Sequence, residues 1–332
     1  MNRAVKIIVV GGNAAGPAAA AKAKRVNPEA QVTLFEAGNY ISTGTCEIPY
    51  VLSGEIKSYE DIIFNTAETF LNKKGVCVFT NHLVEEISRK SKTISVYDKI
   101  SDSRTIYPYD SLILATGSVP KSIPGFTNDL ENTFYLKSVQ DLIAVRKYLD
   151  LNKVATATII GSGYIGLEAA DALVKIGLKI NIVEAKTLPM PDAEVEISLK
   201  ILDELKENSI QFFAGNENIE PYIIGNKVIS IQCDNSSVQT DMVILAAGIS
   251  PNNSLASNSK LEIGTFGGLQ VDRKLRTSDR NIFAAGDNIE VTNAITAKKE
   301  YLPFATFAHS YGHIAGENAA DYSKTDYVAE VD

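Results

Sequence analysis

The pattern of apolar residues predicts the same strand–turn–helix–strand arrangement twice along the chain. In the first copy, the apolar run 5–10 ends at a glycine, the alanine-rich run 14–26 favours a helix, and 31–36 has the composition of a strand. The corresponding segments of the second copy are 156–160, 164–176 and 179–184. Continuous apolar strands joined through a helix are typical of a parallel sheet. The repeat therefore predicts an α/β protein with two Rossmann-like three-layer domains.

Shorter runs between and after these copies predict the rest of the organisation. The segments with the composition of antiparallel strands are 76–80, 93–97, 210–214 and 228–232. Two proline-containing segments, 119–125 and 249–254, are typical of crossings between domains. We therefore predict one domain at 119–247, inserted into a second, discontinuous domain made of residues 1–118 and 248–332.

Composition and charge narrow the class of protein. A chain of 332 residues is longer than one hydrophobic core ordinarily holds, which favours two domains. Its 45% hydrophobic and 22% charged residues are typical of a globular protein. A net charge of −8 argues against a nucleic-acid partner, which requires a basic face. No apolar run reaches the about 18 residues of a membrane span, so no membrane partner is predicted. Three cysteines without a CxxC pair favour a reducing, cytoplasmic compartment and argue against structural zinc.

The first glycine turn, GGNAAG at 11–16, opens a predicted helix directly after a strand. Gly11 permits the tight turn and Gly16 allows close helix–strand packing, although Asn13 replaces the middle glycine of G-x-G-x-x-G. The helix N-terminus directs free N–H groups at a pyrophosphate, and Glu36 ends the next strand, where a carboxylate binds ribose hydroxyls. The predicted cofactor contacts of this turn are Gly11, Gly12, Asn13, Ala15, Gly16 and Glu36.

The second glycine turn, GSGYIG at 161–166, is a complete G-x-G-x-x-G in the same context. Glu184 closes this unit; its carboxylate favours the 2′-hydroxyl of NAD and repels the extra phosphate of NADP, although Lys186 lies nearby. The ring of Tyr164 is placed to cover the site between nucleotide and flavin. The predicted contacts are Gly161, Gly163, Tyr164, Ile165, Gly166 and Glu184.

Three short apolar runs, 112–117, 242–248 and 282–287, end at or beside a glycine. After the third, Gly286 allows close backbone approach and the Asp287 carboxylate suits the hydroxyls of a ribityl chain; an ordinary turn is the competing interpretation. A helix predicted to start near Phe304 would direct its N-terminus at a flavin. The predicted contacts from these segments are Ala115, Thr116, Gly117, Gly248, Gly286, Asp287 and Ala305.

Cys46 is the candidate redox residue. With Thr45 as a predicted N-cap, it falls in a first helical turn, where the helix dipole lowers a thiol pKa; Glu47 opposes this, so the net direction stays open. A small buried apolar residue is the alternative interpretation. Cys77 and Cys233 lie in strand-like runs and are interpreted as structural. His309 and His313 share a helix face, but we interpret them as helix-surface residues and predict no metal.

These motifs together resemble the single-cysteine branch of the FAD-dependent pyridine nucleotide–disulfide oxidoreductases. The resemblance runs nearly end to end and is carried by GGNAAG with Glu36, STGTCEIPY (42–50), LILATGSVP, GSGYIGLE with Glu184, ILAAGISPNN, NIFAAGD and PFATFAHSYGHIAGEN. It implies FAD and NADH as cofactors, with residues 1–118 and 248–332 as the FAD-binding domain and 119–247 as the NAD(P)-binding domain. It also implies that Cys46 is the redox centre beside the flavin. It also implies that Glu168 lies near the nicotinamide and Ser42 near the pyrophosphate and the cysteine.

The chain departs from this family at three points. Oxidase and peroxidase members carry a histidine where this chain has Ala14. The absence of that histidine favours a thiol-type substrate over oxygen or peroxide. Coenzyme A disulfide reductases often have Asn before the cysteine and Gly after it, where this chain has Thr45 and Glu47. The C-terminal segment that forms the dimer interface in this family is missing from the sequence, which stops at Asp332, so a weak or absent dimer is expected.

The sequence therefore predicts an NADH-dependent flavoprotein that reduces a small disulfide or persulfide, such as coenzyme A disulfide, through Cys46. NADH is expected to be preferred over NADPH. The alternatives are an NADH oxidase that reduces oxygen, a reductase of an electron-carrier protein such as rubredoxin, and a flavin-bound interaction module. A thiol beside the flavin distinguishes the first hypothesis from the last two.

Overall fold

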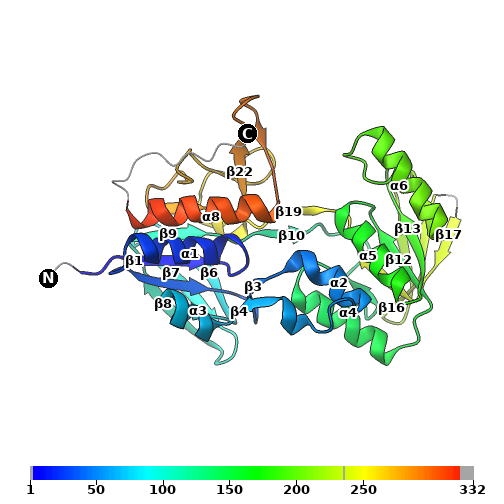
Figure 1. Cartoon of the computed structure of the whole chain (residues 1–332), viewed down its shortest axis with the longest axis horizontal. Helices are drawn as coiled ribbons and strands as arrows, with labels where there is room; N and C mark the ends of the chain where they lie inside the picture. The colour runs from blue at the N-terminus through cyan, green and yellow to red at the C-terminus, as the bar shows by residue number, and fades with distance from the viewer. Residues whose placement is uncertain (1–2, 235, 322–332) are drawn as a thin grey trace. The chain divides into compact units, whose positions relative to one another are not determined.

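The computed structural model describes residues 3–234 and 236–321, so 322–332 of the predicted last segment lie outside the described residues. Contacts divide the chain into two compact units (Figure 1). Unit 1 comprises Met1–Thr43, Ile63–Val119 and Ser250–Asp332, and unit 2 comprises Gly44–Ile62 and Pro120–Ile249. The segment Gly44–Ile62, which carries Cys46, thus groups with unit 2, whereas the sequence analysis placed it within residues 1–118.

Unit 1 is built on a five-stranded parallel sheet. Its order is β21 (Ile282–Ala284), β9 (Ser111–Leu114), β1 (Lys6–Val10), β2 (Gln31–Phe35), β5 (Cys77–Phe79). The strands alternate with helices because a parallel pair requires a crossover connection. As parallel strands leave the sheet at one edge, the ends of β1, β9 and β21, which are neighbours, come together there.

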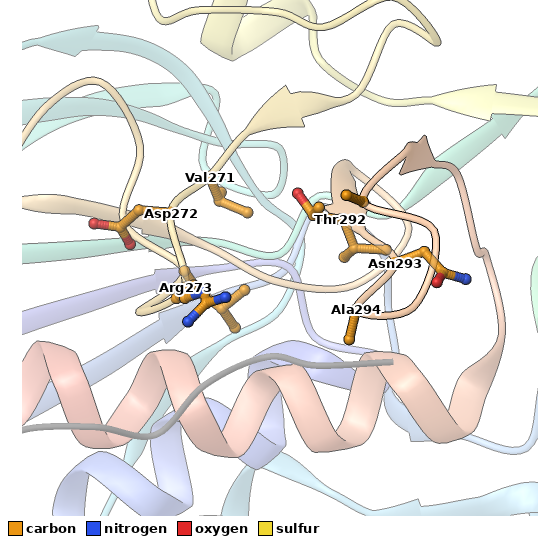
Figure 2. A pocket seen from close by; sticks show the side chains of 9 residues that line it. Val271, Asp272, Arg273, Thr292, Asn293 and Ala294 are labelled. Carbon is orange, nitrogen blue, oxygen red and sulfur yellow. The ribbon is translucent and has the colours of Figure 1, made fainter. Parts of the chain in front are cut away.

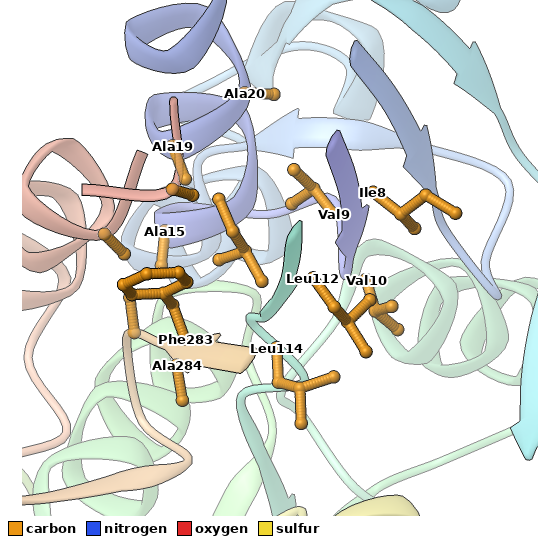
Figure 3. Packing of buried hydrophobic residues seen from close by; sticks show 14 of the residues in the cluster. Ile8, Val9, Val10, Ala15, Ala19, Ala20, Leu112, Leu114, Phe283 and Ala284 are labelled. Atoms are coloured by element: carbon orange, nitrogen blue, oxygen red, sulfur yellow. The ribbon is translucent and has the colours of Figure 1, made fainter. Parts of the chain in front are cut away.

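Helices α1 (Ala15–Val26) and α8 (Ala305–Ala320) lie side by side in unit 1 (Figure 1). Their contact consists of small residues, since a β-carbon at Gly312 would overlap with the carbonyl oxygen of Ala15 and one at Gly316 with that of Ala19. Figure 3 shows Ala15 and Ala19 next to the apolar side chains of the central strands. The alanine-rich composition of 14–26 is therefore explained by close helix packing.

Unit 2 repeats this architecture. Its five-stranded parallel sheet has the order β11 (Thr133–Phe134), β18 (Met242–Leu245), β12 (Thr156–Ile160), β13 (Lys179–Val183), β14 (Gln211–Phe213). Helix α5 (Tyr164–Lys175) connects β12 to β13 as α1 connects β1 to β2. The prediction of two Rossmann-like α/β domains is confirmed.

Two strand predictions were wrong in direction. The runs at 76–80 and 210–214 form β5 and β14, which pair in parallel with β2 and β13. The reason is that helices α3 (Ala67–Lys74) and α6 (Val195–Glu207) precede them and return the chain to the same edge of the sheet. The sequence analysis did not identify either helix.

Each unit also carries a three-stranded antiparallel sheet, which contains the runs predicted at 93–97 and 228–232. In unit 1 the strands are β6 (His82–Ser88), β7 (Thr93–Asp98) and β8 (Ser103–Pro108), and in unit 2 they are β15 (Glu220–Ile224), β16 (Lys227–Cys233) and β17 (Ser236–Gln239). Smaller sheets join β3 (Ile41–Thr43) to β4 (Ile63–Asn65), β10 (Ser118–Pro120) to β19 (Ile249–Pro251), and β20 (Leu269–Gln270) to β22 (Ile289–Thr292) and β23 (Lys299–Glu300).

The remaining helices are short or peripheral. They are the 3₁₀ turns η1 (Thr45–Glu47) and η2 (Tyr59–Ile62), and the α-helices α2 (Ile48–Ser53), α4 (Val139–Leu151) and α7 (Ser254–Asn258). Helix α4 begins with a capping box in which Ser138 and Asp141 satisfy each other's backbone N–H groups. Among the residues that the structure describes, no helix is long and apolar enough to cross a membrane.

Candidate functional site

The first glycine turn lies between β1 and α1 and leaves no room for side chains at its two outer glycines. Gly11 has a φ of 107°, and a β-carbon there would overlap with the carbonyl oxygen of Ala115. A β-carbon at Gly16 would overlap with the carbonyl oxygen of Gly11. Both positions therefore require glycine, so that α1 starts directly against the strand ends.

The Glu36 carboxylate is fixed beside this turn. One oxygen accepts a hydrogen bond from Gly12 N at 2.6 Å and the other accepts one from Gly38 N at 2.6 Å. Asn13, at the position of the missing glycine, accepts hydrogen bonds from Thr43 N at 3.1 Å and Thr43 Oγ1 at 2.9 Å. The Glu36 carboxylate is therefore an acceptor for ribose hydroxyls at the end of β2, next to the first turn of α1.

The ends of the neighbouring strands converge on the same turn. The carbonyl of Ala115 contacts Gly11, and a β-carbon at Gly286 would lie 3.0 Å from Cβ of Ala15. Two hydrogen bonds join Asn252 to the segment just after β9. Thr116 Oγ1 donates to the Asn252 carbonyl at 2.6 Å, and Asn252 N donates to the Gly117 carbonyl at 2.9 Å. Ser42, with a φ of 51°, donates its N–H to the Gly12 carbonyl at 2.8 Å. The predicted contacts of unit 1 thus form one cluster.

Asp287 and its surroundings supply further polar groups to this cluster. Ser118 Oγ donates a hydrogen bond to Asp287 Oδ2 at 2.8 Å. The Tyr301 hydroxyl is buried next to Ser118 and Asp287. Burial raises the pKa of Tyr301, and the charge of Asp287 adds to this effect. Ala305 is the first residue of α8, and its N-cap Phe304 makes no side-chain cap, so the N–H groups of this turn are available.

These residues fit FAD. The cradle at Gly11 and Gly12, the carboxylate of Glu36 and the α1 N-terminus provide what an adenosine diphosphate requires. The buried hydroxyl of Tyr301, next to Asp287 and Ser118, fits the hydroxyl groups of a ribityl chain. Sequence reasoning selected Asp287 but missed Ser118 and Tyr301; the position of Ser118 directly after Gly117 was the available signal.

The second glycine turn has the same construction in unit 2. A β-carbon at Gly161, whose φ is 101°, would overlap with the Ala246 carbonyl oxygen, and one at Gly166 would overlap with the Gly161 carbonyl oxygen. At Gly163, in contrast, a β-carbon would meet no atom within 4 Å. Packing does not explain this glycine, whereas close approach of a pyrophosphate to the N-terminus of α5 does.

Glu184 closes the second turn as Glu36 closes the first. It is 8% exposed and accepts hydrogen bonds from Ser162 N at 2.8 Å and Ser162 Oγ at 2.7 Å through one oxygen. Tyr164 is 66% exposed at the start of α5. Ile165 and Gly248 line one small hollow. These features fit a nicotinamide dinucleotide, and Ser162 is a polar contact that the sequence analysis did not select.

Cys46 lies in η1, and its predicted setting requires correction. Gly44, not Thr45, caps this turn, and the following helix α2 begins only at Ile48 with Glu47 as its N-cap residue. The thiol is exposed. Burial of part of the residue raises its pKa, and the charges of Glu47 and Glu168 raise it further. The direction that the sequence left open is therefore a raised pKa, caused first by burial and then by the two carboxylates.

Cys46 and Glu168 belong to unit 2. Helix α2, which follows Cys46, packs against helix α5, which contains Glu168. Burial also raises the pKa of the Glu168 carboxyl. The other two cysteines are not uniformly buried: Cys77 is exposed at the start of the edge strand β5, and Cys233 is half-buried at the end of β16. Cys77, interpreted from the sequence as structural, is thus not a buried residue, because β5 is the outermost strand of its sheet.

The histidine pair and one surface pocket lie outside these clusters. His309 and His313 have ring centroids 4.6 Å apart, and in the described part of the chain no three metal-ligating side chains gather. A pocket of about 160 Å³ in unit 1 is lined by residues of two segments, 271–275 and 291–297 (Figure 2). None of the residues selected from the sequence lines it, so we assign it no part in the chemistry.

Two glycine turns, each followed by an acid at the end of the second strand, define a protein of the two-dinucleotide oxidoreductase class. Residues 5–311 match the family described as pyridine nucleotide-disulphide oxidoreductase, and the chain belongs to this family. It is therefore an oxidoreductase that uses FAD and NAD(P)H.

Relatives of known description agree with this assignment. The chain is 32% identical over 317 residues to an NADH oxidase of Methanocaldococcus jannaschii, covering 95% of this chain and 70% of that one. It is 32% identical to an NAD(P)H sulfur oxidoreductase (CoA-dependent) of Pyrococcus abyssi, covering 95% and 69%. The structure of an NAD-dependent persulfide reductase from A. fulgidus superposes with a TM-score of 0.90 at 30% identity, covering 95% of this chain. The chain spans only 59% of that reductase.

Proposed function

We propose that this protein transfers two electrons from NADH, by way of FAD and Cys46, to a small disulfide or persulfide such as coenzyme A disulfide. Unit 1 is assigned to FAD through the Glu36 turn and Asp287, and unit 2 to NADH through the Glu184 turn. FAD, when bound, accepts a hydride from the nicotinamide and passes its two electrons on to sulfur.

The observation that carries this proposal is the exposed thiol of Cys46 on a segment that packs against the nucleotide-binding helix α5. A structural cysteine is usually buried, whereas a thiol that forms a mixed disulfide must be reached by its substrate. Ala14 supports the choice of a sulfur substrate, because members that act on oxygen or peroxide resemble one another in carrying a histidine there.

The reaction at Cys46 balances without another reactant. The thiolate attacks one sulfur of the substrate disulfide, which forms a mixed disulfide and releases the first thiolate. Two electrons from NADH then cleave the mixed disulfide, which releases the second thiol and restores Cys46. The sum is NADH, one proton and one disulfide giving NAD⁺ and two thiols. Since Glu47 and Glu168 raise the Cys46 pKa, this attack is expected to accelerate with pH.

The named relatives support a sulfur acceptor, since one is described as a CoA-dependent sulfur oxidoreductase and another as a persulfide reductase. Oxygen is the second candidate acceptor, because the Methanocaldococcus jannaschii relative is described as an NADH oxidase. In that reaction oxygen would first take two electrons from NADH to give hydrogen peroxide, which would oxidise the Cys46 thiol to a sulfenic acid and release one water. A second NADH would reduce the sulfenic acid back to the thiol and release the other water. The two candidates therefore share Cys46 and differ in the molecule that oxidises it.

The decisive experiment is anaerobic NADH titration of the flavin-loaded protein, followed by turnover with coenzyme A disulfide, a persulfide, oxygen and a carrier protein. Cys46→Ser should retain reduction of the flavin by NADH and lose disulfide turnover by orders of magnitude, because a hydroxyl cannot form the mixed disulfide. Cys77→Ser is the matched control, since Cys77 is also exposed. Full turnover by Cys46→Ser with its best acceptor would refute the proposal and favour a carrier protein.

A further inference from the structure

The helix that follows Cys46 is too short to hold its own shape. Helix α2 has six residues, and helices far longer than this are marginal in water. Its apolar side, Ile48, Val51 and Leu52, is buried, but the Cys46 turn at its amino end is exposed. Contacts at the carboxyl end of α2 therefore add to those of its buried side in fixing the position of the thiol.

Arg146 of α4 makes one such contact. Its guanidinium Nη1 donates a hydrogen bond of 2.8 Å to the carbonyl of Val51, which also accepts from Gly54 N at 3.2 Å. A cation at the carboxyl end of a helix satisfies orphan carbonyls and complements the helix dipole. The interaction joins residues 95 positions apart in the sequence.

Lys175 makes the second contact at the same end. It is the last residue of α5, and its ammonium group lies 2.7 Å from Glu55 Oε1 and 2.9 Å from Asp171 Oδ2. Glu55 directly follows Gly54, the left-handed C-cap of α2, whose φ is 86°. The chain beyond α2 is therefore tied to the nucleotide-binding helix itself.

We propose that Arg146 and Lys175 are positioning residues for Cys46, which hold the carboxyl end of α2 so that its amino end presents the thiol in a fixed place. This inference rests on the proposed function of Cys46 as the redox residue. Neither cation is assigned a contact with substrate or cofactor. Both act through the backbone and the side chain of the segment that carries the thiol.

The first test is Arg146→Met, which removes the donor and keeps most of the apolar stem, in a background of Cys77→Ser and Cys233→Ser. Iodoacetamide should alkylate Cys46 about threefold faster or more, because the released turn exposes the thiol further. In the flavin-loaded protein, reduction of the flavin by NADH should keep its rate, while disulfide turnover falls. Arg146→Lys should restore part of both properties. Lys147→Met, an exposed neighbour on α4, is the control and should change neither.

The second test is Lys175→Met, with Lys206→Met as control because Lys206 makes a comparable surface pair with Asp203 on α6. Lys175→Met should shift alkylation and turnover in the same directions as Arg146→Met. The inference would be overturned if both variants kept the wild-type alkylation rate and the wild-type turnover. It would also be overturned if flavin reduction and disulfide turnover fell equally. If Cys46→Ser kept full turnover, the proposed function would fail instead, and the alkylation rates would still report on positioning.

Discussion

The Glu184 carboxylate is held over the second glycine turn by Ser162, whose backbone N–H and hydroxyl both donate to the same oxygen, at 2.8 and 2.7 Å. The other oxygen accepts from Lys186 N at 2.9 Å. A carboxylate that is 8% exposed and held on both oxygens cannot move away from an approaching anion. This fixed charge lies where the adenosine ribose of a nicotinamide dinucleotide is expected.

We predict that NADH is preferred over NADPH and that Glu184→Ala narrows the preference. Burial of a 2′-phosphate against a carboxylate is unfavourable by roughly a few kcal/mol, so the ratio of kcat/KM values should fall by about tenfold or more. Steady-state kinetics with both nucleotides gives this ratio. Ser162→Ala keeps the charge and should keep most of the preference. Equal kcat/KM values for the two nucleotides in the wild-type protein would contradict the assignment.

Two glycines of the same turn should respond differently to alanine. Gly166→Ala should destabilise the protein by more than about 1 kcal/mol, because its β-carbon overlaps with the Gly161 carbonyl oxygen. Gly163→Ala should leave the thermal midpoint unchanged, since that β-carbon meets no protein atom, but it should weaken NADH binding. Thermal unfolding and NADH titration separate the two effects. Unimpaired NADH affinity in Gly163→Ala would show that the pyrophosphate lies elsewhere.

The repeated units could be predicted from the sequence because their strongest signals are local. At Gly11 and Gly161 a neighbouring carbonyl excludes any β-carbon, so each position requires glycine. The glycine is therefore a sequence signal that lies directly after the strand it ends. The helices before β5 and β14 were missed although local signals were present. Helix α3 begins with a capping box of Thr66 and Thr69, and α6 has its apolar residues on one face, although Val195, Ile197 and Leu199 are about half exposed in the structure.

The place of the Cys46 segment could not be predicted, because long-range contacts fix it. Arg146 reaches Val51 across 95 positions and Lys175 reaches Glu55 across 120, and neither pair has a local pattern. The predicted N-cap at Thr45 failed because the turn there is a 3₁₀ helix that starts after Gly44. By contrast, the Ser138–Asp141 capping box that starts α4 was readable from the sequence and was overlooked.

We predict that Tyr301 contributes to the flavin end of the FAD site. Its buried hydroxyl lies beside Ser118 and Asp287, where the ribityl chain is expected, so Tyr301→Phe should weaken FAD binding and leave ADP binding unchanged. Isothermal titration of the apoprotein with each ligand tests this. Tyr311→Phe is the control, because it also removes a buried hydroxyl, one that has no hydrogen-bond partner among the described residues. Equal weakening of FAD and ADP would assign Tyr301 a purely structural role.

The last prediction concerns the pH dependence of Cys46. Burial, Glu47 and Glu168, in that order, raise its thiol pKa, so the alkylation rate should have its inflection above the ordinary value for a thiol, about 8.5. Replacing a carboxylate by an amide removes a negative charge that disfavours the thiolate. Glu168→Gln should therefore move the inflection to lower pH, and Glu47→Gln should move it further, because Glu47 has the larger effect.

Iodoacetamide rates between pH 6 and about 11, in the Cys77→Ser and Cys233→Ser background, measure these shifts. Asp150→Asn on α4 is a suitable control, as no effect of Asp150 on Cys46 is found. At neutral pH the two glutamine variants should react faster than the parent protein, since a larger fraction of the thiol is ionised. A shift to higher pH in Glu168→Gln would mean that this carboxyl accepts the thiol proton instead of opposing its loss, and the electrostatic account of Cys46 would have to be reversed.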